Sequence, residues 1–264
     1  MESSTSGRPV AVVTGASAGI GKEFCVRLAA RGYDLILVAR DGNRLEALRA
    51  ELEQRHGITA DVFPADLSLD DDVSRLAGLM AGTSRLAMLV NNAGFGTRGN
   101  LADASPARQE AMLRLHTLAP MRLTQAALPV LLRNRKGAVV NVSSVASFLY
   151  SAGNVNYCAT KAYLTNFSEG LAAELRGTGV QAQALCPGFT RSEFHQRMDA
   201  DIESIPGWMW MSASRVVETS LRSLERGGPV VCVPGFRYKL AVLLLHLLPR
   251  RLIGPLARLR ARQV

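Results

Sequence analysis

The chain has 264 residues, of which 48% are hydrophobic and 20% are charged, and this composition predicts a globular protein with a sizeable core. Its net charge of +9 is compatible with nucleic acid, a phosphorylated cofactor or an anionic lipid surface as partner. Nucleic acid is excluded as the expected partner, because aromatic and basic residues are not interleaved. No apolar run reaches the roughly 18–20 residues of a membrane-spanning helix, so none is expected.

The N-terminus and the cysteines indicate a cytoplasmic protein. Residues 1–8 are rich in Ser and Gly and lack the apolar core of a signal peptide, so we expect a disordered lead-in there. The four cysteines are scattered, without the spacing of a metal site or of a disulfide framework. Free thiols in a reducing compartment are the simplest interpretation, and no metal site is expected.

A glycine-rich turn separates the first expected strand, residues 10–14, from a helical pattern that continues to residue 31. Strand, glycine turn and helix in this order predict a phosphate site. The glycines let the backbone approach a pyrophosphate, and the helix N-terminus presents free N–H groups. A glycine turn without a ligand is the alternative interpretation. The residues expected to contact a cofactor here are Gly15, Ser17, Ala18, Gly19, Ile20 and Gly21.

Arg40 follows the second expected strand, residues 34–39. An acid in this region usually binds a ribose 2′-hydroxyl, whereas an Arg suits a 2′-phosphate. We therefore expect NADP(H) in preference to NAD(H), although Asp41 directly follows. A solvated charge at a helix start is the alternative interpretation of Arg40.

Helices and strands continue to alternate up to a second turn, after the fourth expected strand, that is a candidate ligand contact. Asp66 and Leu67 close the third expected strand, where a carboxylate can meet the adenine amine. The fourth strand runs into Asn92, Ala93 and Gly94, a turn that either places backbone against a ligand or is stabilised by its Asn. The expected elements are an amphipathic helix at 43–56, a strand at 60–65, a helix at 70–81 and a strand at 86–91.

The second half of the chain repeats this alternation. Residues 107–132 predict a long helix that Pro120 and Pro129 must kink or interrupt. The later expected elements are strands at 138–142, 180–186 and 229–233, helices at 155–175 and 212–226, and an irregular stretch at 192–210. Alternating strands and helices predict a single α/β domain over residues 9–235, with a doubly wound, seven-stranded parallel sheet.

Ser144, Tyr157 and Lys161 are the candidate catalytic group. Tyr157 and Lys161 are four residues apart and therefore share one face of a helix. An ammonium beside a phenol lowers the pKa of the Tyr, which can then give a proton to a carbonyl oxygen or take one from an alcohol. Ser144 follows the fifth strand, from where its hydroxyl can hold the substrate oxygen next to Tyr157. The alternative is a Tyr–Lys surface pair.

Taken together, these motifs resemble the short-chain dehydrogenase/reductase family across nearly the whole chain. The matching segments are residues 14–21, Asn91 to Gly94, Ser144, Tyr157 with Lys161, and Pro187-Gly188 with Thr190. The resemblance implies a Rossmann-type sheet, a nicotinamide cofactor and a homo-oligomer, dimer or tetramer. It implies that Tyr157 is the general acid/base, that Lys161 binds the nicotinamide ribose and that Ser144 orients the substrate. Its implied cofactor contacts include Asn91, Ala93 and Gly94, Asp66 and Leu67 at the adenine, and Pro187, Gly188 and Thr190 on the carboxamide side.

Two positions depart from the family pattern. Many members carry an Asn on the long helix as a fourth catalytic residue, which supports a water relay behind the Lys, and this chain has His116 there. A His can hold a water or carry a proton, or it can be a packed, neutral replacement. Relatives that prefer NADP often have a basic residue before the second glycine. This chain has Ala18, so the expectation of NADP(H) depends on Arg40 alone.

Residues 236–264 predict a basic, apolar helical extension. Residues 238–248 are nearly all apolar, and Pro249 ends that segment. Arginines follow at Arg250, Arg251, Arg258, Arg260 and Arg262. Such helices either pack on the protein or a dimer partner, which we favour because a Leu-rich stretch is usually core, or lie in the headgroup layer of an anionic membrane. The C-terminal part also resembles a bacterial subgroup of the family that acts on or near lipid and ketoacyl substrates.

The leading hypothesis is an NADP(H)-dependent oxidoreductase that interconverts a ketone and a secondary alcohol on a small apolar substrate, with a lipid or ketoacyl compound as one option. We expect it in the cytoplasm, with a peripheral position at the inner membrane face as an option. The alternatives are a cofactor-binding sensor or scaffold without turnover, and a peripheral membrane protein that acts through its basic tail.

Overall fold

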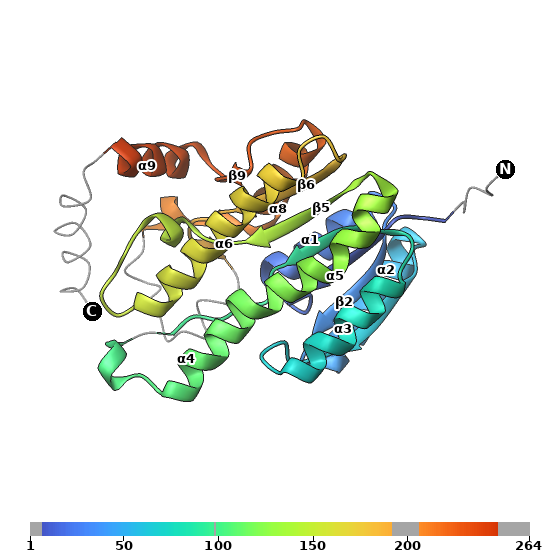
Figure 1. The fold of residues 1–264 in the computed structure, drawn as a ribbon, viewed down its shortest axis with the longest axis horizontal. Helices are drawn as coiled ribbons and strands as arrows, with labels where there is room; N and C mark the ends of the chain where they lie inside the picture. The colour runs from blue at the N-terminus through green and yellow to red at the C-terminus, as the bar shows by residue number, and fades with distance from the viewer. Residues whose placement is uncertain (1–6, 98, 192–205, 248–264) are drawn as a thin grey trace.

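A seven-stranded parallel sheet forms the centre of the computed structural model, which describes residues 7–97, 99–191 and 206–247 (Figure 1). The strand order is β3-β2-β1-β4-β5-β6-β9, and every pair of neighbours is parallel. The strands are β1 (Val10–Thr14), β2 (Asp34–Ala39), β3 (Ala60–Pro64), β4 (Leu86–Asn91), β5 (Gly137–Val142), β6 (Val180–Leu185) and β9 (Val231–Cys232). The predicted α/β class and doubly wound sheet are confirmed.

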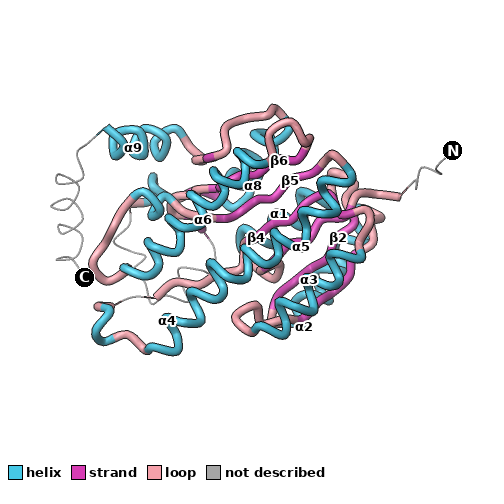
Figure 2. The backbone as a smooth tube through the Cα atoms, in the orientation of Figure 1, coloured by secondary structure: helices cyan, strands magenta, loops and turns pink. Residues whose placement is uncertain are grey.

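Helices cover both faces of this sheet (Figures 1 and 2). Side chains alternate along each strand, so Ala11 and Val13 of β1 face one layer of helices while Val10 and Val12 face the other. The first layer consists of α1 (Gly19–Ala29), α2 (Gly42–His56) and α8 (Ala213–Glu225). The second consists of α3 (Asp70–Gly82), α5 (Ala119–Asn134) and α6 (Val155–Glu174). Burial on both faces explains why β1 is apolar at four consecutive positions.

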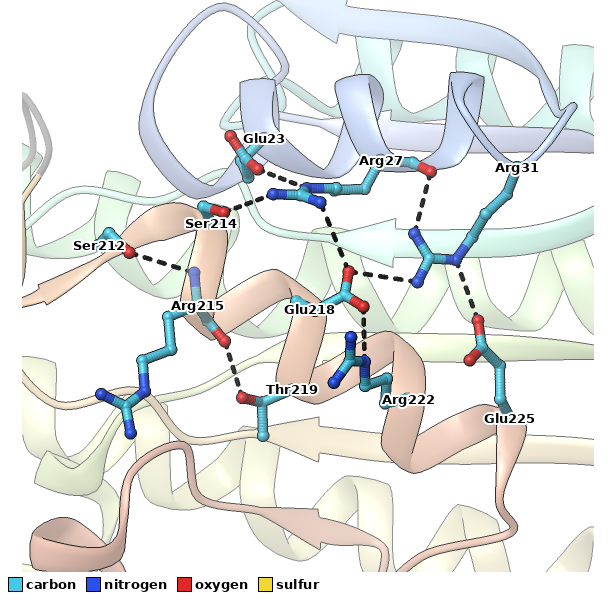
Figure 3. Close-up of polar contacts among 10 residues, drawn as sticks. All are labelled: Glu23, Arg27, Arg31, Ser212, Ser214, Arg215, Glu218, Thr219, Arg222 and Glu225. Carbon is cyan, nitrogen blue, oxygen red and sulfur yellow. Dashed lines mark hydrogen bonds and ion pairs between the residues drawn. The ribbon is translucent and has the colours of Figure 1, made fainter.

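Ion pairs tie α1 to α8 at the surface of the first layer (Figure 3). Glu218 of α8 lies 3.7 Å from Arg27 and 3.3 Å from Arg31, both on α1. Arg31 also contacts Glu225 at 2.9 Å. Partly exposed pairs of this kind contribute about 0–1 kcal/mol each, so their effect is mainly to set the position of α8 along α1.

Smaller elements complete the described chain. β7 (Thr190–Arg191) and β8 (Met211–Ser212) form a two-stranded parallel sheet that the sequence did not predict. α4 (Pro106–Leu113) precedes α5, and α9 (Phe236–Leu247) follows β9. Short 3-10 helices cover Leu101–Asp103, Val145–Phe148 and Gly207–Met209. Among the described residues, no helix is long and apolar enough to span a membrane.

The long helix predicted over residues 107–132 is continuous but irregular. A π-helical turn, Arg114–Leu118, joins α4 to α5 directly before Pro120. Pro120, which has no N–H to donate, follows this π-helical turn, so the irregular hydrogen bonding lies where a regular α-helix could not continue. Pro129 does not interrupt the helix, because α5 continues through it to Asn134, and that part of the prediction was wrong.

Other predicted boundaries differ by a few residues at most, and the seventh strand is shorter than predicted. That strand was predicted over residues 229–233 and is confined to Val231–Cys232. Most of the predicted irregular stretch, residues 192–205, lies outside the described residues, as do residues 1–6 of the predicted lead-in and residues 248–264 of the predicted C-terminal extension. The helix predicted from the apolar stretch at residues 238–248 is present as α9, Phe236–Leu247.

Candidate active site

The candidate site lies at the carboxyl ends of the parallel strands. The strand order reverses between β1 and β4, and in open α/β sheets the crevice outside such a point binds ligands. The loops that follow β1, β4, β5 and β6 carry most of the residues that the sequence predicted for the site. The sheet therefore brings together segments that are far apart in the sequence.

The glycine turn after β1 has the backbone geometry that its residues predict. Gly15 has a φ of 67°, a conformation that glycine adopts without strain. A Cβ placed on Gly21 would lie 2.1 Å from the Gly15 carbonyl oxygen, so only glycine lets α1 pack this closely on the turn. Ala18, at the N-cap of α1, supplies no side-chain cap, and the first turn contains no acid. The N-terminal N–H groups of α1 are thus not capped by a side chain, which suits a bound phosphate.

Asn92 braces this turn. Its side-chain amide donates to the carbonyl oxygens of Thr14 at 2.8 Å and Gly15 at 3.2 Å. The Thr14 hydroxyl accepts in turn from the backbone N–H groups of Asn92 at 2.9 Å and Ala93 at 3.0 Å. The Asn turn therefore holds the loops after β1 and β4 together, which is the stabilising role that the sequence left open.

Asn91 belongs to a buried polar network between the sheet and its helices. Its side-chain nitrogen donates to the Asn141 side chain at 2.8 Å and to Thr124 at 3.3 Å. The Asn141 side-chain nitrogen donates to Ser168 of α6 at 2.9 Å. This network links β4, β5, α5 and α6, so the side chain of Asn91 positions strands and helices that carry the site. Sequence analysis missed Asn141, although a polar residue inside an apolar strand was a usable signal.

Arg40 is exposed at the carboxyl end of β2, beside the glycine turn. Ala16 donates its N–H to the Val38 carbonyl at 3.1 Å, which fixes the turn against the end of this strand. The carboxylate of Asp41 accepts from the N–H of Arg44 at 3.1 Å and caps α2. Asp41 is therefore engaged in a helix cap, which accounts for an acid next to the predicted 2′-phosphate ligand.

Asp66 forms a turn after β3. Its Oδ1 accepts from the N–H of Ser68 at 3.0 Å and from the Ser68 hydroxyl at 2.7 Å. Leu67 is buried, with 5% of its surface exposed. β3 is next to β2 in the sheet, so these residues lie along the same edge as Arg40. Together with the glycine turn, the residues present fit an adenine dinucleotide along this edge.

Ser144, Tyr157 and Lys161 converge at the end of β5. Tyr157 and Lys161 occupy the first two turns of α6, with the Lys161 Nζ 5.7 Å from the centre of the Tyr157 ring. The Ser144 hydroxyl hydrogen-bonds to Tyr157 and accepts from the N–H of Ala146 at 3.1 Å. The sequence prediction that these three side chains meet is thus matched by their positions.

The pKa values of this group differ from the expectation. Burial raises the pKa of Tyr157 to about 12, and the hydrogen bond from Ser144 opposes this rise. The net lowering that the sequence predicted is not met in this structure, because burial is the largest effect on the pKa of Tyr157. The ammonium of Lys161 donates to the Val142 carbonyl at 2.8 Å. Burial also lowers the pKa of Lys161 to about 8. Tyr157 therefore carries its proton at neutral pH, and Lys161 remains mostly charged.

Ser143 and Thr165 support Lys161 from behind, and sequence analysis missed both. The Ser143 hydroxyl donates to the Lys161 carbonyl oxygen at 2.8 Å, and Thr165 donates to the same oxygen at 3.2 Å. Both side chains are buried. Their contacts fix α6 on β5 at the turn that carries Lys161, so they help to set where its ammonium lies.

His116 connects the loop after β4 to α6. Its Nε2 accepts from the N–H of Phe95 at 3.1 Å, and its Nδ1 lies 3.0 Å from the Thr160 hydroxyl. Burial and, to a smaller extent, the charge of Lys161 hold the pKa of His116 well below its usual range. A Cβ on Gly94 would lie 2.8 Å from Nε2, so Gly94 leaves the space that the ring fills. The imidazole is neutral and is enclosed between two segments of the site.

The loop after β6 closes the site on its other side. Thr190 donates its hydroxyl to the Gly188 carbonyl at 3.0 Å, and the Pro187 carbonyl accepts from the N–H of Val145 at 3.0 Å. The Tyr238 hydroxyl accepts from the N–H of Phe189 at 3.0 Å. A Cβ on Gly188 would lie 2.0 Å from the Tyr238 ring, so this close contact requires glycine. Tyr238 was not predicted as part of the site, because it is distant in sequence.

A dinucleotide-type sheet with a Ser, Tyr and Lys group at its carboxyl edge defines an oxidoreductase of the Rossmann type. A family profile described as short chain dehydrogenase matches residues 9–203. The chain belongs to the short-chain dehydrogenase family.

Three comparisons place the chain within this family. A short-chain dehydrogenase from Sphingobium yanoikuyae, solved in complex with NADPH, has a TM-score of 0.82 at 35% identity, over 86% of this chain and 88% of that chain. An uncharacterized oxidoreductase from Myxococcus xanthus is 32% identical over 94% of this chain and 96% of its own length. A very-long-chain 3-oxoacyl-CoA reductase from Neurospora crassa is 35% identical over 64% of this chain, which spans about half, 52%, of that relative.

Proposed function

We propose that the protein is an NADP(H)-dependent oxidoreductase that interconverts a ketone and a secondary alcohol on an apolar substrate, with Tyr157 as the general acid/base. The observation that carries this proposal is the hydrogen-bonded pair of Ser144 and Tyr157 beside the buried ammonium of Lys161. These three groups lie at the sheet edge where the glycine turn is also found.

The side chains have distinct tasks in this proposal. A bound nicotinamide supplies or accepts the hydride. Ser144 donates a hydrogen bond to the carbonyl oxygen, and Tyr157 transfers its phenolic proton to that oxygen as the carbonyl is reduced. A pKa of about 12 keeps this proton on Tyr157 at neutral pH, so the phenol is available as the proton donor. Lys161 supplies a positive charge close to the ring and a donor for the ribose.

The glycine turn and the edge beyond it hold the cofactor in this proposal. Arg40 is the ligand of the 2′-phosphate, because a guanidinium offers two parallel donors to a phosphate and is exposed beside the turn. NADPH in the Sphingobium relative supports this choice. The proposed contacts are Gly15, Ser17, Ala18, Gly19, Ile20, Gly21, Arg40, Asp66, Leu67, Asn91, Ala93, Gly94, Tyr157, Lys161, Pro187, Gly188 and Thr190.

His116 is a positioning residue in this proposal and does not carry protons. The Thr160 hydroxyl donates to the Tyr157 carbonyl at 2.9 Å, so it accepts from His116 and the ring proton is on Nδ1. Nε2 is then the acceptor for Phe95. Both nitrogens are engaged in contacts that join two loops, which supports a structural task near Tyr157 in place of the water relay of the family pattern.

The substrate is proposed to be an apolar ketone, with a 3-oxoacyl chain as the first candidate. Aromatic side chains lie around the loops of the site: Phe189 and Trp210 are 5.7 Å apart, and Phe95 is 5.9 Å from His116. The name of the Neurospora relative supports an acyl substrate. The test is a series of ketones and 3-oxoacyl thioesters, from short-chain to long-chain, followed by NADPH absorbance. Turnover that rises with apolar chain length supports the proposal, and no oxidation of NADPH by any compound contradicts it.

We also propose how the protein assembles and where it is located. Leu113 and Leu118 are each 44% exposed near the junction of α4 and α5, and an apolar surface of this kind suits a homo-oligomer, a dimer or a tetramer. The four cysteines are free and buried, which supports a reducing compartment such as the cytoplasm. We also propose a peripheral contact with anionic membrane, for which α9 offers a surface. Light scattering on a sizing column measures the assembly.

A further inference from the structure

Helix α9 turns an apolar face to solvent. Its exposed members are Phe236 at 77%, Leu240 at 44%, Leu243 at 55%, Leu244 at 50% and Leu247 at 72%. These positions recur at intervals of three and four residues, so they form one stripe along a helix with 3.6 residues per turn. We call this stripe the α9 face. Of the favoured expectation, packing on the protein itself is seen for the other side of the helix, and packing on a dimer partner stays a prediction.

The opposite side of α9 is fixed to the protein. Val242 is buried, and Tyr238 packs with it against Val145 and Phe148. The Tyr238 hydroxyl also donates to the Met209 carbonyl at 2.7 Å. A helix held on one side by these contacts presents the α9 face as a preformed surface, with no need to unfold or to move.

Basic residues flank the α9 face. At about 100° per residue, Arg237 and Lys239 fall on the two borders of the apolar stripe. Arg237 also lies over the ring of Trp208, 5.1 Å from its centre, and Trp208 is 63% exposed. An apolar stripe bordered by cations, with an exposed Trp beside it, is typical of a helix that lies in the headgroup layer of a membrane.

The excess positive charge lies in the C-terminal part of the sequence. Residues 226–264 contain eight of the 31 basic residues and none of the 22 acidic ones. The remaining part of the chain is nearly neutral, with 23 basic and 22 acidic residues. A second copy of this region, or the basic sequence after α9, would bring like charges to the α9 face. Anionic lipid supplies both the apolar interior and the opposite charge that this surface lacks.

The anchored side of α9 reaches the active site. Tyr238 contacts Gly188 and Phe189 in the loop after β6, and Val145 directly follows Ser144. The α9 face is therefore one helix thickness away from two loops of the active site, the loop after β6 and the loop after β5 that carries Ser144. Figure 1 shows α9 at the same end of the molecule as the start of α6, which carries Tyr157.

We propose that the α9 face docks on an anionic lipid surface and places the substrate side of the active site at the membrane, so that apolar ketones enter from the lipid phase. The docking part stands on the surface and charge of α9. The substrate route rests on the proposed function, because it takes for granted that an apolar ketone is the substrate.

The test of docking is vesicle flotation with the full chain. Vesicles contain either phosphatidylcholine alone or phosphatidylcholine with roughly one-third phosphatidylglycerol. We expect the protein to float with the anionic vesicles at about 0.1 M salt and much less at about 0.5 M salt. The double substitution Leu243→Glu and Leu247→Glu should weaken vesicle binding by roughly 100-fold, because it removes two apolar contacts and adds repelling charge.

A matched control makes the same chemical change elsewhere. Leu79 and Leu132 are 42% and 39% exposed on α3 and α5, and Leu79→Glu with Leu132→Glu should leave flotation unchanged. Docking is overturned if the unaltered protein stays with the soluble fraction, or if the α9 and control variants float alike. Loss of oligomer mass in the α9 variant, without flotation of the unaltered protein, would identify a second copy as the occupant and also overturn the proposal.

The substrate route is measured separately. With a long-chain ketone held in anionic vesicles, the KM of the α9 variant should rise about tenfold, while its kinetics with a short, water-soluble ketone stay unchanged. Equal KM values for both proteins in vesicles would contradict the route. Flotation needs no turnover, so absence of ketone reduction would overturn the proposed function and leave the docking result standing.

Discussion

His116 and Thr160 are joined through the ring Nδ1 and the threonine hydroxyl, which are 3.0 Å apart. The contact fixes which nitrogen holds the ring proton, because the Thr160 hydroxyl is already a donor to the Tyr157 carbonyl. Phe95 approaches the other nitrogen from the loop after β4. One neutral side chain thus connects the cofactor edge of the site to the helix that carries Tyr157 and Lys161.

Replacement of His116 tests whether it positions or carries protons. His116→Leu removes both hydrogen bonds and leaves the Phe95 N–H without its partner, so we expect a loss of about 1–3 kcal/mol in the free energy of unfolding and a lower kcat. His116→Asn, which can keep one of the contacts, should recover part of each loss. Urea unfolding and steady-state kinetics measure the two effects.

The pH profile of kcat distinguishes the two roles of His116. Its pKa is held well below the usual range, so a positioning residue should contribute no ionisation to the profile near neutral pH. We expect His116→Asn to lower the whole profile without changing its shape. Disappearance of an acidic limb in this variant would mean that His116 carries a proton, contrary to the proposal.

Tyr157→Phe tests the proton donor directly. The substitution keeps the ring but removes the transferable proton, so kcat should fall by about 10²–10⁴-fold while NADPH still binds. Ser144→Ala should lower kcat by about 10²–10³-fold, because it removes the donor to the carbonyl oxygen. Cofactor fluorescence titration serves as the control for intact binding. Substantial turnover in Tyr157→Phe would require another proton donor.

Lys161 should reduce the stability of the fold in which it acts. Burial lowers its pKa from 10.5 to about 8, so between these values the unfolded chain binds more protons than the folded one. The free energy of unfolding should therefore rise with pH across this window. The penalty is fully present below pH 8, where it amounts to about 3 kcal/mol.

Lys161→Met should thus stabilise the protein at pH 7 while it abolishes turnover. The lost hydrogen bond to Val142 offsets about 1 kcal/mol of the gain, which leaves about 2 kcal/mol. The advantage of the variant should shrink as the pH is raised from 7 to about 10. Urea unfolding at several pH values measures this. A variant that is less stable than the unaltered protein at pH 7 would show that burial of the ammonium carries no such penalty.

The sequence was sufficient to predict the sheet, because β-branched runs and glycine turns report local structure. Tyr157 and Lys161 were predictable for the same reason: a four-residue spacing on a helix is local. Ser144 was predictable as well, because it lies two residues after the end of β5, the strand that precedes this helix. The sequence could not show that burial raises the pKa of Tyr157, because burial depends on the packing of α6 against β5 and the loops.

Contacts between distant segments account for what the sequence did not predict. Tyr238 meets Phe189 across 49 positions in the chain, and Asn91 meets Asn141 across 50. No local pattern marks such pairs. The Leu-rich stretch of α9 was expected to pack on the protein or on a dimer partner. Hydrophobicity alone does not tell which side of a helix the protein covers. The exposed stripe could be identified only from the structure, in which Val242 marks the side of the helix that packs on the protein.

Arg40 should determine the choice of cofactor. Its exposed guanidinium lies beside the glycine turn, and Asp41, the acid next to it, is engaged as the cap of α2. NADPH should therefore bind more tightly than NADH by about 1–3 kcal/mol, or roughly 5- to 150-fold, if one charge-assisted contact to the 2′-phosphate carries the difference. Titration of both cofactors by fluorescence measures this ratio.

Arg40→Ala should bring the two affinities together by weakening NADPH and leaving NADH nearly unchanged, because NADH has no 2′-phosphate for Arg40 to bind. Arg49→Ala is the matched control, because it makes the same change in net charge. Arg49 is an exposed residue of α2 that pairs with Glu46 at 2.7 Å. The control should keep the preference for NADPH, which separates a specific contact from the general field of a basic protein. Equal affinities in the unaltered protein, or an unchanged ratio in Arg40→Ala, would exclude Arg40 as the 2′-phosphate ligand.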